Sequence, residues 1–431
     1  MISLYPHQQR ELAETEGMTH VAYYHDMGLG KTYTGAEKMM RLGANINLVV
    51  CQKSKVDDWI KHFTDNYNDF PYVSDIFDLT KKKQFDEFIR CNKQDFSDGL
   101  DPCYYIGVIN YELAFRRPQL KMLEDFTLML DESSMIQNET AKRSKFILSL
   151  KPKNVILLSG TPTGGKYEKL WSQLKLLGWK ISKSLFWKQY VDVEIMDNQG
   201  FPIKIVKGYK NVDRLKSKMR QYGCRFLKTE EVFDLPQQNF ISMSIPSTKE
   251  YRKFKRSSLI EIDGTELVGD TTLKKMLYER QLCGQYNKAK LDAFRDIVES
   301  TDDRLIVFYN FNEELEKLCK IAWDYNRPVS VVNGQQKDLL PYENVSESIT
   351  FIQYQAGAMG LNLQKANKIV YFTPPLSSEL FEQSKKRIHR IGQQQPCFYY
   401  ELICKNSVEE KIYETLKMRK DYTEALFEME R

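Results

Sequence analysis

Residues 20–41 read HVAYYHDMGLGKTYTGAEKMMR, and this stretch decides the fold of the first half of the chain. The apolar run from His20 to His25 is typical of a β-strand, and a helical pattern of apolar residues continues through Arg41. The glycine-bearing turn between them, DMGLGKT, leaves backbone N–H groups free to cradle phosphate. The stretch therefore predicts a strand, a phosphate-binding loop and a helix in succession.

Four residues of this loop are candidates for holding a nucleotide. Gly28 and Gly30 allow the backbone to approach phosphate closely. Lys31 suits the β- and γ-phosphates, and the hydroxyl of Thr32 suits Mg²⁺. The usual phosphate-loop pattern has a glycine at position 25, where this chain has His25. A glycine-rich turn with a chance Gly-Lys-Thr is the alternative, but the flanking strand and helix favour the phosphate-binding interpretation.

Further strands are predicted through the first half by short apolar runs at 47–51, 105–110, 126–130 and 154–158. Helical patterns lie between several of them, for example at 56–63 and 84–91. Alternating strands and helices predict a parallel sheet that is covered on both faces. Ligands of such sheets bind at the carboxyl ends of the strands, so the residues that carry chemistry should stand directly after strands.

Two short motifs stand in such positions. Asp131 and Glu132 follow the strand that ends at Leu130; the aspartate can hold Mg²⁺ through water, and the glutamate can orient or deprotonate an attacking water. Residues 159–162, SGTP, are either a plain turn or a hinge that senses the nucleotide. Near the N-terminus, Gln8 could recognise an adenine edge, because an amide both donates and accepts hydrogen bonds.

The second half repeats the rhythm of strands and helices. A proline-marked stretch predicts a domain boundary after Pro236, and a helical region follows at 249–300. Beyond it, strands are predicted at 304–309, 329–333, 349–353, 368–372 and 397–403. These patterns predict a second α/β domain of similar build. The amphipathic helix expected from residue 407 to residue 430 would brace one domain against the other.

Residues 383–393, QSKKRIHRIGQ, carry a cluster of basic side chains in this second domain. The guanidinium groups of Arg387 and Arg390 are rigid planar forks that suit phosphate oxygens. Delivered to the nucleotide from a second domain, they would meet the charge that develops on the γ-phosphate. Alone such a cluster is a solvated basic face, but the phosphate loop, acidic pair and SGTP turn favour the functional interpretation.

Two further stretches could contact phosphate or nucleic acid. The turn at 355–363, QAGAMGLNL, follows a predicted strand and includes Gly360. Residues 204–228 are basic, with only Asp213 opposing Lys204, Lys207, Lys210, Arg214, Lys216, Lys218, Arg220, Arg225 and Lys228. Such a run is either a solvated face or a surface that tracks phosphates, and the sequence leaves both interpretations open.

Composition narrows the class of protein. The formal net charge of +5 permits a polyanion as partner without demanding one. The eight cysteines are scattered and form no C-x-x-C pair, which argues against a zinc site or a disulfide framework and fits a reducing cytoplasm. No apolar run resembles a signal peptide or a membrane span, so we expect no membrane partner.

Taken together, these motifs resemble those of the Swi/Snf-type ATPases within the superfamily-two helicases, nearly from end to end. The resemblance is carried by DMGLGKT (26–32), NLVVCQKSKVDDWIKHF (47–63), VINYE (108–112), DESS (131–134), LLSGTPTGGKYEKLWSQLKLL (157–177), RFLKTEEVFDLP (225–236), QAGAMGLNL (355–363) and QSKKRIHRIGQQQP (383–396). It implies a P-loop NTPase of two RecA-like lobes, each a mostly parallel sheet flanked by helices. The lobes would span residues 1–236, with a helical, basic protrusion at about 165–235, and residues 237–431.

Carried over residue by residue, the resemblance implies an ATP site that both lobes complete. The residues implied are Gln8, Gly28, Gly30, Lys31, Thr32, Gly360 and Gln383 for ATP; Thr32 and Asp131 for Mg²⁺; Lys31, Asp131, Glu132, Arg387 and Arg390 for catalysis; and Lys53, Ser54 and Asn362 for nucleic acid. Lys204, Lys207 and Lys210 are further nucleic-acid candidates, which rest on the charge pattern of the basic run and not on the resemblance. Three positions depart from the family's pattern. Ser134 replaces the histidine of the DExH box, Lys386 an acidic residue and Ala358 a glycine.

The resemblance implies an ATP-dependent translocase on double-stranded DNA, acting in remodelling, fork or branch processing, or reannealing. A helicase that separates strands of DNA or RNA is the alternative with the same chemistry. A nucleotide-gated binding module without turnover is the alternative of another class, and the retained Glu132, Arg387 and Arg390 disfavour it. We expect a monomer on double-stranded or branched DNA, targeted by a protein partner because no accessory module is recognisable. Its compartment would be the cytoplasm of a bacterial or phage-infected cell, or a eukaryotic nucleus.

Overall fold

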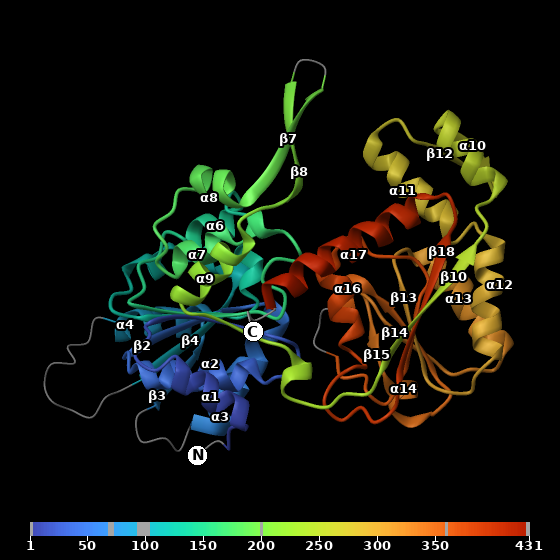
Figure 1. Ribbon diagram of the computed structural model, residues 1–431. Helices are drawn as coiled ribbons and strands as arrows, with labels where there is room; N and C mark the ends of the chain where they lie inside the picture. The colour runs from blue at the N-terminus through green and yellow to red at the C-terminus, as the bar shows by residue number, and fades with distance from the viewer. Residues whose placement is uncertain (1–2, 68–72, 93–103, 199–200, 358–360, 428–431) are drawn as a thin grey trace, which may run out of the picture. The chain divides into compact units, whose positions relative to one another are not determined.

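The computed structural model describes residues 3–67, 73–92, 104–198, 201–357 and 361–427. The chain divides into two compact units between Val232 and Phe233. The first unit comprises residues 1–232 and the end of the chain from residue 422, and the second comprises residues 233–421. Figure 1 draws both units and labels most of their helices and strands.

A parallel sheet forms the centre of the first unit. Among the described residues its seven strands lie in the order β3-β4-β2-β5-β6-β1-β9, and every pairing is parallel. The strands are β1 (His20–His25), β2 (Ile46–Cys51), β3 (Val73–Asp78), β4 (Tyr104–Asn110), β5 (Thr127–Leu130), β6 (Asn154–Leu158) and β9 (Cys224–Leu227). Because they are parallel, their carboxyl ends meet at one edge of the sheet.

Helices cover both faces of this sheet. They are α1 (Pro6–Glu14), α2 (Lys31–Leu42), α3 (Val56–Tyr67), α4 (Lys82–Cys91), α5 (Tyr111–Ala114), α6 (Lys142–Ile147), α7 (Trp171–Leu176), α8 (Lys183–Tyr190) and α9 (Val212–Gln221). Alternate side chains of the central strands enter two different cores. On β2, Leu48 and Val50 pack in one cluster with residues of α6 and α7, whereas Val49 and Cys51 pack in another with residues of α2 and α3. Both faces are therefore buried, as a parallel sheet requires.

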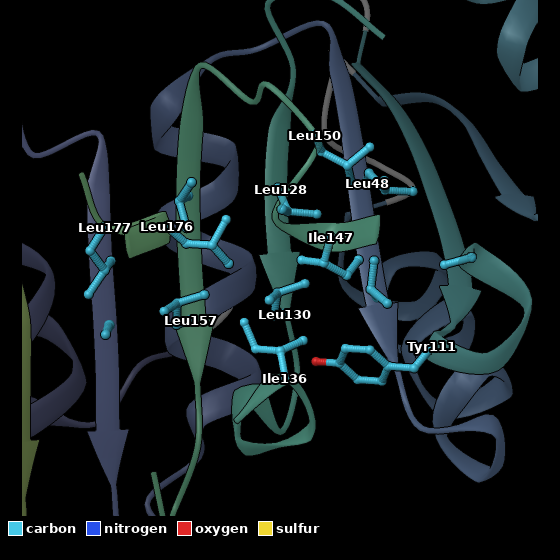
Figure 2. Close-up of a cluster of buried hydrophobic side chains, with 14 of the residues drawn as sticks. Leu48, Tyr111, Leu128, Leu130, Ile136, Ile147, Leu150, Leu157, Leu176 and Leu177 are labelled. Atoms are coloured by element: carbon cyan, nitrogen blue, oxygen red, sulfur yellow. The ribbon is translucent and has the colours of Figure 1, made fainter. Parts of the chain in front are cut away.

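Figure 2 shows part of the first of these clusters. The leucines at positions 48, 128, 130 and 157 come from three neighbouring strands and are fully buried. Ile136 and Ile147 cover them, and the ring of Tyr111 lies at the end where β5 stops. This core fixes the level at which the strands end, and hence the position of the residues that follow them.

The second unit is built around a mostly parallel sheet of similar kind. Among its described residues the strands lie in the order β10-β18-β17-β13-β16-β14-β15, and only the β14–β15 pairing is antiparallel. They are β10 (Gln238–Ile245), β13 (Leu305–Tyr309), β14 (Val329–Val332), β15 (Lys337–Asp338), β16 (Ile349–Gln353), β17 (Lys368–Tyr371) and β18 (Cys397–Cys404). The expectation of two mostly parallel sheets flanked by helices is confirmed.

The helices of the second unit are α10 (Lys249–Ser257), α11 (Thr272–Cys283), α12 (Lys288–Glu299), α13 (Asn312–Asp324), α14 (Leu340–Asn344), α15 (Tyr354–Gly357) and α16 (Ser378–Lys385), and most of α17 (Val408–Phe427) also belongs to it. Residues of α12 and α13 pack on one face of the sheet. Residues of α16 and α17 pack on the other face, as Figure 1 also shows. No helix that the structure describes is long and apolar enough to cross a membrane.

The stretch 165–235, which we expected to be helical and basic, contains an antiparallel hairpin. Strands β7 (Val191–Asn198) and β8 (Phe201–Tyr209) pair between α8 and α9. The physical reason is visible in the sequence, because β-branched and charged residues alternate over 191–195 and so give the period of two that a strand requires.

A second hairpin interrupts the region 249–300, which we expected to be helical throughout. Strands β11 (Leu259–Ile262) and β12 (Thr265–Val268) pair between α10 and α11. Asp263 and Gly264 connect them, and both have positive φ angles, of 50° and 73°. An Asp-Gly pair is a strong hairpin signal in a sequence, because both residues tolerate this conformation.

A buried ion pair joins α12 to α17 in the second unit. The Nζ atom of Lys290 lies 2.6 and 2.7 Å from the two carboxylate oxygens of Glu409, and neither side chain is exposed to solvent. Cys283, Cys404 and Glu409 also place potential metal ligands within 4.8 Å of one another. Lys290 already neutralises the Glu409 carboxylate. The ion pair therefore explains why this carboxylate is buried, and no metal ion is needed.

We predict that Glu409→Ala lowers the free energy of unfolding of the second unit by about 3–5 kcal/mol, because the charge of Lys290 would stay buried without its partner. Urea unfolding followed by circular dichroism measures this. The double variant Lys290→Met, Glu409→Gln removes both charges and should recover most of the loss. Equal losses in the single and double variants would contradict this account.

Glu314 gives the second unit a dependence on pH. Its buried carboxylate accepts hydrogen bonds from the backbone N–H groups of Asn310 (2.9 Å) and Phe311 (3.2 Å) and from the hydroxyl of Thr373 (3.0 Å). Burial nevertheless raises its pKa from 4.5 to about 7. Between these values the folded unit holds a proton that the unfolded chain has lost, so this group's contribution to stability falls as the pH rises and is lost above about pH 7.

The variant Glu314→Gln should therefore flatten the dependence of stability on pH. Urea unfolding of the second unit at pH 5, 6, 7 and 8 compares the two proteins. This range covers most of the interval in which the folded and unfolded states differ in the protonation of Glu314. We expect the parent chain to lose more stability than the variant across this range. An identical dependence on pH in both proteins would show that Glu314 does not titrate there.

Candidate nucleotide-binding site

The loop between β1 and α2 has a backbone that only glycine adopts readily. Gly28 and Gly30 have φ angles of 89° and 70°, in the left-handed region. At Gly30 space is also short, because a Cβ atom there would lie 2.3 Å from Nε2 of Gln8. The strand, loop and helix follow one another as the sequence predicted.

Lys31 is held at the carboxyl end of β1. Its Nζ atom donates hydrogen bonds to the main-chain carbonyls of His25 (2.8 Å) and Asp26 (3.0 Å). The SGTP turn lies beside it, since a Cβ atom at Gly160 would be 3.4 Å from the same Nζ. Thr32 is partly buried in the first turn of α2. The amine is thus placed between the phosphate loop and the turn that follows β6.

The structure shows why a histidine is tolerated at position 25. The His25 side chain is fully buried, and its Nε2 atom lies 3.4 Å from the carboxylate of Glu11 on α1. Arg225 on β9 lies 3.3 Å from the same carboxylate. Burial lowers the pKa of His25, which favours the neutral ring. The imidazole packs against α1. The histidine therefore leaves the positions of Gly28, Gly30 and Lys31 undisturbed.

Gln8 lies against the phosphate loop. Its Nε2 atom donates to the carbonyls of Gly30 (3.1 Å) and Leu29 (3.4 Å), and its Oε1 atom accepts from the N–H of Tyr5 (2.9 Å). The side chain is 2% exposed. These contacts position α1 on the loop, and adenine recognition by Gln8 stays a prediction.

The acidic pair follows β5 directly, and two aromatic residues hold it. The indole Nε1–H of Trp59 donates to Oδ2 of Asp131 (2.9 Å), and the hydroxyl of Tyr111 donates to the main-chain carbonyl of Asp131 (2.9 Å). Burial raises the pKa of Asp131, while the Trp59 hydrogen bond and the charge of Lys31 oppose that rise. Glu132 has a φ of 50°, and its carboxylate lies 3.5 Å from the hydroxyl of Ser159.

Sheet order explains why these residues meet. Strands β5, β6 and β1 are consecutive neighbours, and they carry the acidic pair, the SGTP turn and the phosphate loop at their carboxyl ends. The result is an amine, two carboxylates and hydroxyl groups around backbone N–H donors. Oxygen donors of this kind are the ligands that Mg²⁺ prefers, and an amine beside a glycine loop suits phosphate. The residues present therefore fit a magnesium nucleotide.

Gln173 on α7 connects these motifs, although the sequence analysis did not single it out. Its Oε1 atom accepts from the hydroxyls of Ser133 (2.8 Å) and Tyr24 (3.0 Å), and its Nε2 atom donates to the carbonyl of Pro162 (2.8 Å). The carbonyl of Pro162 can only accept, so this orientation of the amide is consistent at all three contacts. Gln173 is fully buried and ties the DESS segment to the SGTP turn. The one sequence signal was a glutamine inside the apolar run LWSQLKLL.

In the second unit, hydrogen bonds join the end of the QAGAMGLNL segment (355–363) to the QSKKRIHRIGQ segment (383–393). Nη1 of Arg387 donates to the carbonyl of Leu361 (3.3 Å), and the carbonyl of Arg387 accepts from the N–H of Leu363 (3.1 Å). Arg390 hydrogen-bonds the side-chain oxygen of Asn362. The two arginines are therefore fixed on residues 361–363.

The remaining predicted residues of the second unit are placed as follows. Gln383 is nearly buried on α16, with its Nε2 atom 3.4 Å from Glu379. The imidazole of His389 lies 3.0 Å from the carbonyl of Pro236. Gly360 and Ala358 lie outside the described residues.

The candidate nucleic-acid residues occupy different environments. Lys53 and Ser54 are exposed in the short turn that follows β2. Lys207 forms an ion pair with Glu194 across the β7–β8 hairpin (2.6 Å). Lys204 and Lys210 instead line a groove beside α8. The three lysines of the basic run are therefore not equivalent.

Two mostly parallel sheets flanked by helices, one with a phosphate loop after β1 and an Asp-Glu pair after β5, define the class of two-domain P-loop NTPases. Comparison with family models gives the particular family. The SNF2-related domain matches residues 21–288, more than half of the chain, and the helicase conserved C-terminal domain matches residues 289–392. The chain belongs to the SNF2-related family.

Curated relatives agree with this assignment. The mouse SWI/SNF-related matrix-associated actin-dependent regulator of chromatin subfamily A member 1 is 23% identical over 92% of this chain and 40% of its own length. The yeast (Saccharomyces cerevisiae) ISWI chromatin-remodeling complex ATPase ISW1 is 24% identical over 92% of this chain and 38% of its own length. The Bacillus subtilis putative ATP-dependent helicase/translocase YwqA is 24% identical over 70% of this chain and 36% of its own length. The chain thus spans about two fifths of the length of these relatives.

Among solved structures, the Sulfolobus solfataricus SWI2/SNF2 ATPase core in complex with double-stranded DNA is similar over 98% of this chain and 92% of that chain. The sequence identity is 19% and the TM-score is 0.43. The family assignment above rests on the sequence matches.

We predict that Gln173→Glu lowers kcat for ATP hydrolysis about tenfold with little change in KM for ATP. A glutamate still accepts from Ser133 and Tyr24 but cannot donate to the Pro162 carbonyl, and one lost hydrogen bond is worth about 1.4 kcal/mol, or tenfold in rate. Steady-state kinetics in the presence of DNA measures the effect.

Gln173→Met serves as the matched variant, because it keeps the side-chain length and removes all three hydrogen bonds without adding a charge. We expect it to lower kcat at least as far as the glutamate variant does. Lower melting temperatures with unchanged kcat in both variants would show that Gln173 only supports the fold and is not a positioning residue.

Proposed function

We propose that this chain is an ATP-dependent DNA translocase that couples ATP hydrolysis to movement along double-stranded DNA. The observation that carries the proposal is the common strand edge that brings Lys31, the Asp131–Glu132 pair and the SGTP turn together. Membership of the SNF2-related family implies the use of ATP. The remodelling ATPases and the helicase/translocase among its relatives support DNA as the track.

In this mechanism the first unit binds the nucleotide. Backbone N–H groups of the loop around Gly28 and Gly30 would cradle the phosphates, and the Lys31 amine would leave its carbonyl partners to neutralise the β- and γ-phosphates. Thr32 and Asp131 would hold Mg²⁺, which supplies further charge neutralisation on the phosphates. Trp59 keeps the Asp131 carboxylate oriented, since it donates to one of its oxygens.

Glu132 would orient the attacking water and take its proton. Its carboxylate already lies beside the Ser159 hydroxyl, at the start of the SGTP turn. Gln173 would transmit a change at this turn to the DESS segment, because it hydrogen-bonds both. Ser134 stands where the family's box has histidine, and the glutamine offers the link that this histidine would otherwise provide.

Residues of the second unit would complete the site. Arg387 and Arg390 would stabilise the charge that develops on the γ-phosphate, and Gln383 would contact the nucleotide. Both arginines are tied to the loop after β16. Binding of phosphate by the arginines would therefore move a segment that also carries Asn362, a candidate DNA contact. Closing on ATP and opening after hydrolysis would drive steps along the duplex.

The proposed cycle also requires DNA as a partner. Lys53, Ser54 and Asn362 would contact the DNA backbone, and all three are exposed. A monomer carries every residue that this mechanism uses, and a protein partner would direct it to its site of action. Such a protein would work where the DNA is, in the cytoplasm of a bacterial or phage-infected cell or in a nucleus.

Steady-state ATP hydrolysis tests the proposal, measured without nucleic acid and with single-stranded DNA, double-stranded DNA, forked DNA and RNA at one fixed salt concentration, because phosphate contacts depend on salt. We predict the strongest stimulation by duplex or forked DNA. Glu132→Gln should lower kcat about a hundredfold or more, since it removes the general base. Lys31→Ala should lower it as well.

Each alternative has its own outcome in this experiment. Stimulation by single strands or RNA alone would favour a strand-separating helicase. Nucleotide-dependent DNA binding that survives in Lys31→Ala and Glu132→Gln, without turnover in the parent chain, would favour a binding module. ATP hydrolysis that no nucleic acid stimulates would contradict the translocase proposal.

A further inference from the structure

The β7–β8 hairpin extends from the first unit beyond α8 and carries none of the nucleotide-site residues (Figure 1). Hydrophobic side chains on it are exposed to solvent, for example Ile195 at 64% and Met196 at 49%. A two-stranded hairpin that leaves such residues in water gains little stability from them. Apolar side chains gathered on a projecting element are typical of an interaction surface.

One face of the hairpin combines apolar and basic side chains. Val193 pairs with Val206, and Ile195 pairs with Lys204. Side chains that stand opposite each other in an antiparallel pair project from the same face, as do residues two apart along a strand. This face therefore presents three β-branched side chains and a lysine together.

A groove of about 610 Å³ lies where the hairpin meets α8. We call it the α8–hairpin groove. It is lined by Lys183, Ser184, Trp187, Lys188, Val191, Val193, Lys204 and Lys210. Four of these residues are basic and none is acidic, so the groove is strongly electropositive.

Three of the four lysines keep their charge available. Lys183 forms an ion pair with Glu139. In the part of the chain that the structure describes, Lys188, Lys204 and Lys210 have no ion-pair partner. Unpaired lysines that converge on one groove repel each other, and an anionic ligand relieves that repulsion.

The composition of the walls indicates which polyanion fits. A duplex presents phosphates and sugars on its outside. These groups would bind the lysines but would leave the apolar surface without a partner. A single strand also offers unstacked bases, which pack against aromatic and aliphatic side chains. Trp187, Val193 and the adjoining Ile195 supply that surface next to the free amines.

We propose that the α8–hairpin groove binds a single-stranded segment of nucleic acid, such as the free strand at a fork or branch. Lys188, Lys204 and Lys210 would contact its phosphates, and the apolar wall would contact its bases. The proposal rests on the proposed function in taking nucleic acid as the substrate. It deepens that function by giving the motor a second contact that distinguishes branched DNA from plain duplex.

Binding of an oligothymidine labelled with a fluorophore tests the proposal, with anisotropy measured without ATP over a series of salt concentrations. The triple variant Lys188→Ala, Lys204→Ala, Lys210→Ala should weaken binding at least tenfold. The slope of log affinity against log salt should become shallower by about 2, which is 0.7 for each of three lost phosphate contacts. The double variant Glu194→Gln, Lys207→Gln is the matched control on the same hairpin, because it removes an ion pair without changing the net charge, and it should lose far less affinity than the triple variant does.

Blunt duplex DNA provides the second arm. We expect the triple variant to lose much less affinity for blunt duplex than for oligothymidine, because the proposed duplex contacts are made by Lys53, Ser54 and Asn362, and circular dichroism verifies that the variant is folded. Unchanged binding of oligothymidine, or equal losses for oligothymidine and blunt duplex, would overturn the assignment of a single strand. Because binding is measured without ATP, this result is separate from any failure of ATP hydrolysis in the parent chain.

Discussion

The parallel alignment of β5, β6 and β1 is the constraint on which the candidate site depends. Leu130 pairs with Leu157, and Leu158 pairs with Tyr23, so β6 ends one residue beyond β5 and β1 ends two residues beyond β6 at the same edge of the sheet. Hydrophobic cores on both faces of the sheet fix this register, because a slip of one residue would exchange the side chains of the two cores. Everything that follows these strands is thereby brought to one edge.

Hydrogen bonds then fix the residues at that edge. The Lys31 amine is held by two main-chain carbonyls at the end of β1 and directly after it. Trp59 holds the carboxylate of Asp131, and Tyr111 holds its main-chain carbonyl. Gln173 joins the segments after β5 and β6 from a helix behind them. The groups that would meet a nucleotide are consequently oriented by neighbours from four different elements. Such preorganisation is what phosphoryl transfer requires of a protein.

How much the sequence predicts depends on how strong its local signals are. The ten apolar runs predict strands because they are short and rich in apolar residues, and most of them are continuously buried, for example residues 154–158. The β7–β8 hairpin and β10 were missed, since they are exposed and carry polar residues where a core strand is apolar. The phosphate loop and the acidic pair are recognisable in the sequence because their chemistry requires particular residue types at adjacent positions of the chain. Gln173 is not, because a hydrogen-bond hub is defined by three partners that are distant along the chain.

Displacement of a third strand from a DNA triplex tests the central claim most directly, because a protein releases that strand only if it moves along the underlying duplex. The account predicts that the chain displaces the third strand with ATP, that omitting ATP prevents displacement, and that Glu132→Gln abolishes it. An intact triplex under conditions where the chain hydrolyses ATP and separates a forked duplex would contradict translocation and favour strand separation.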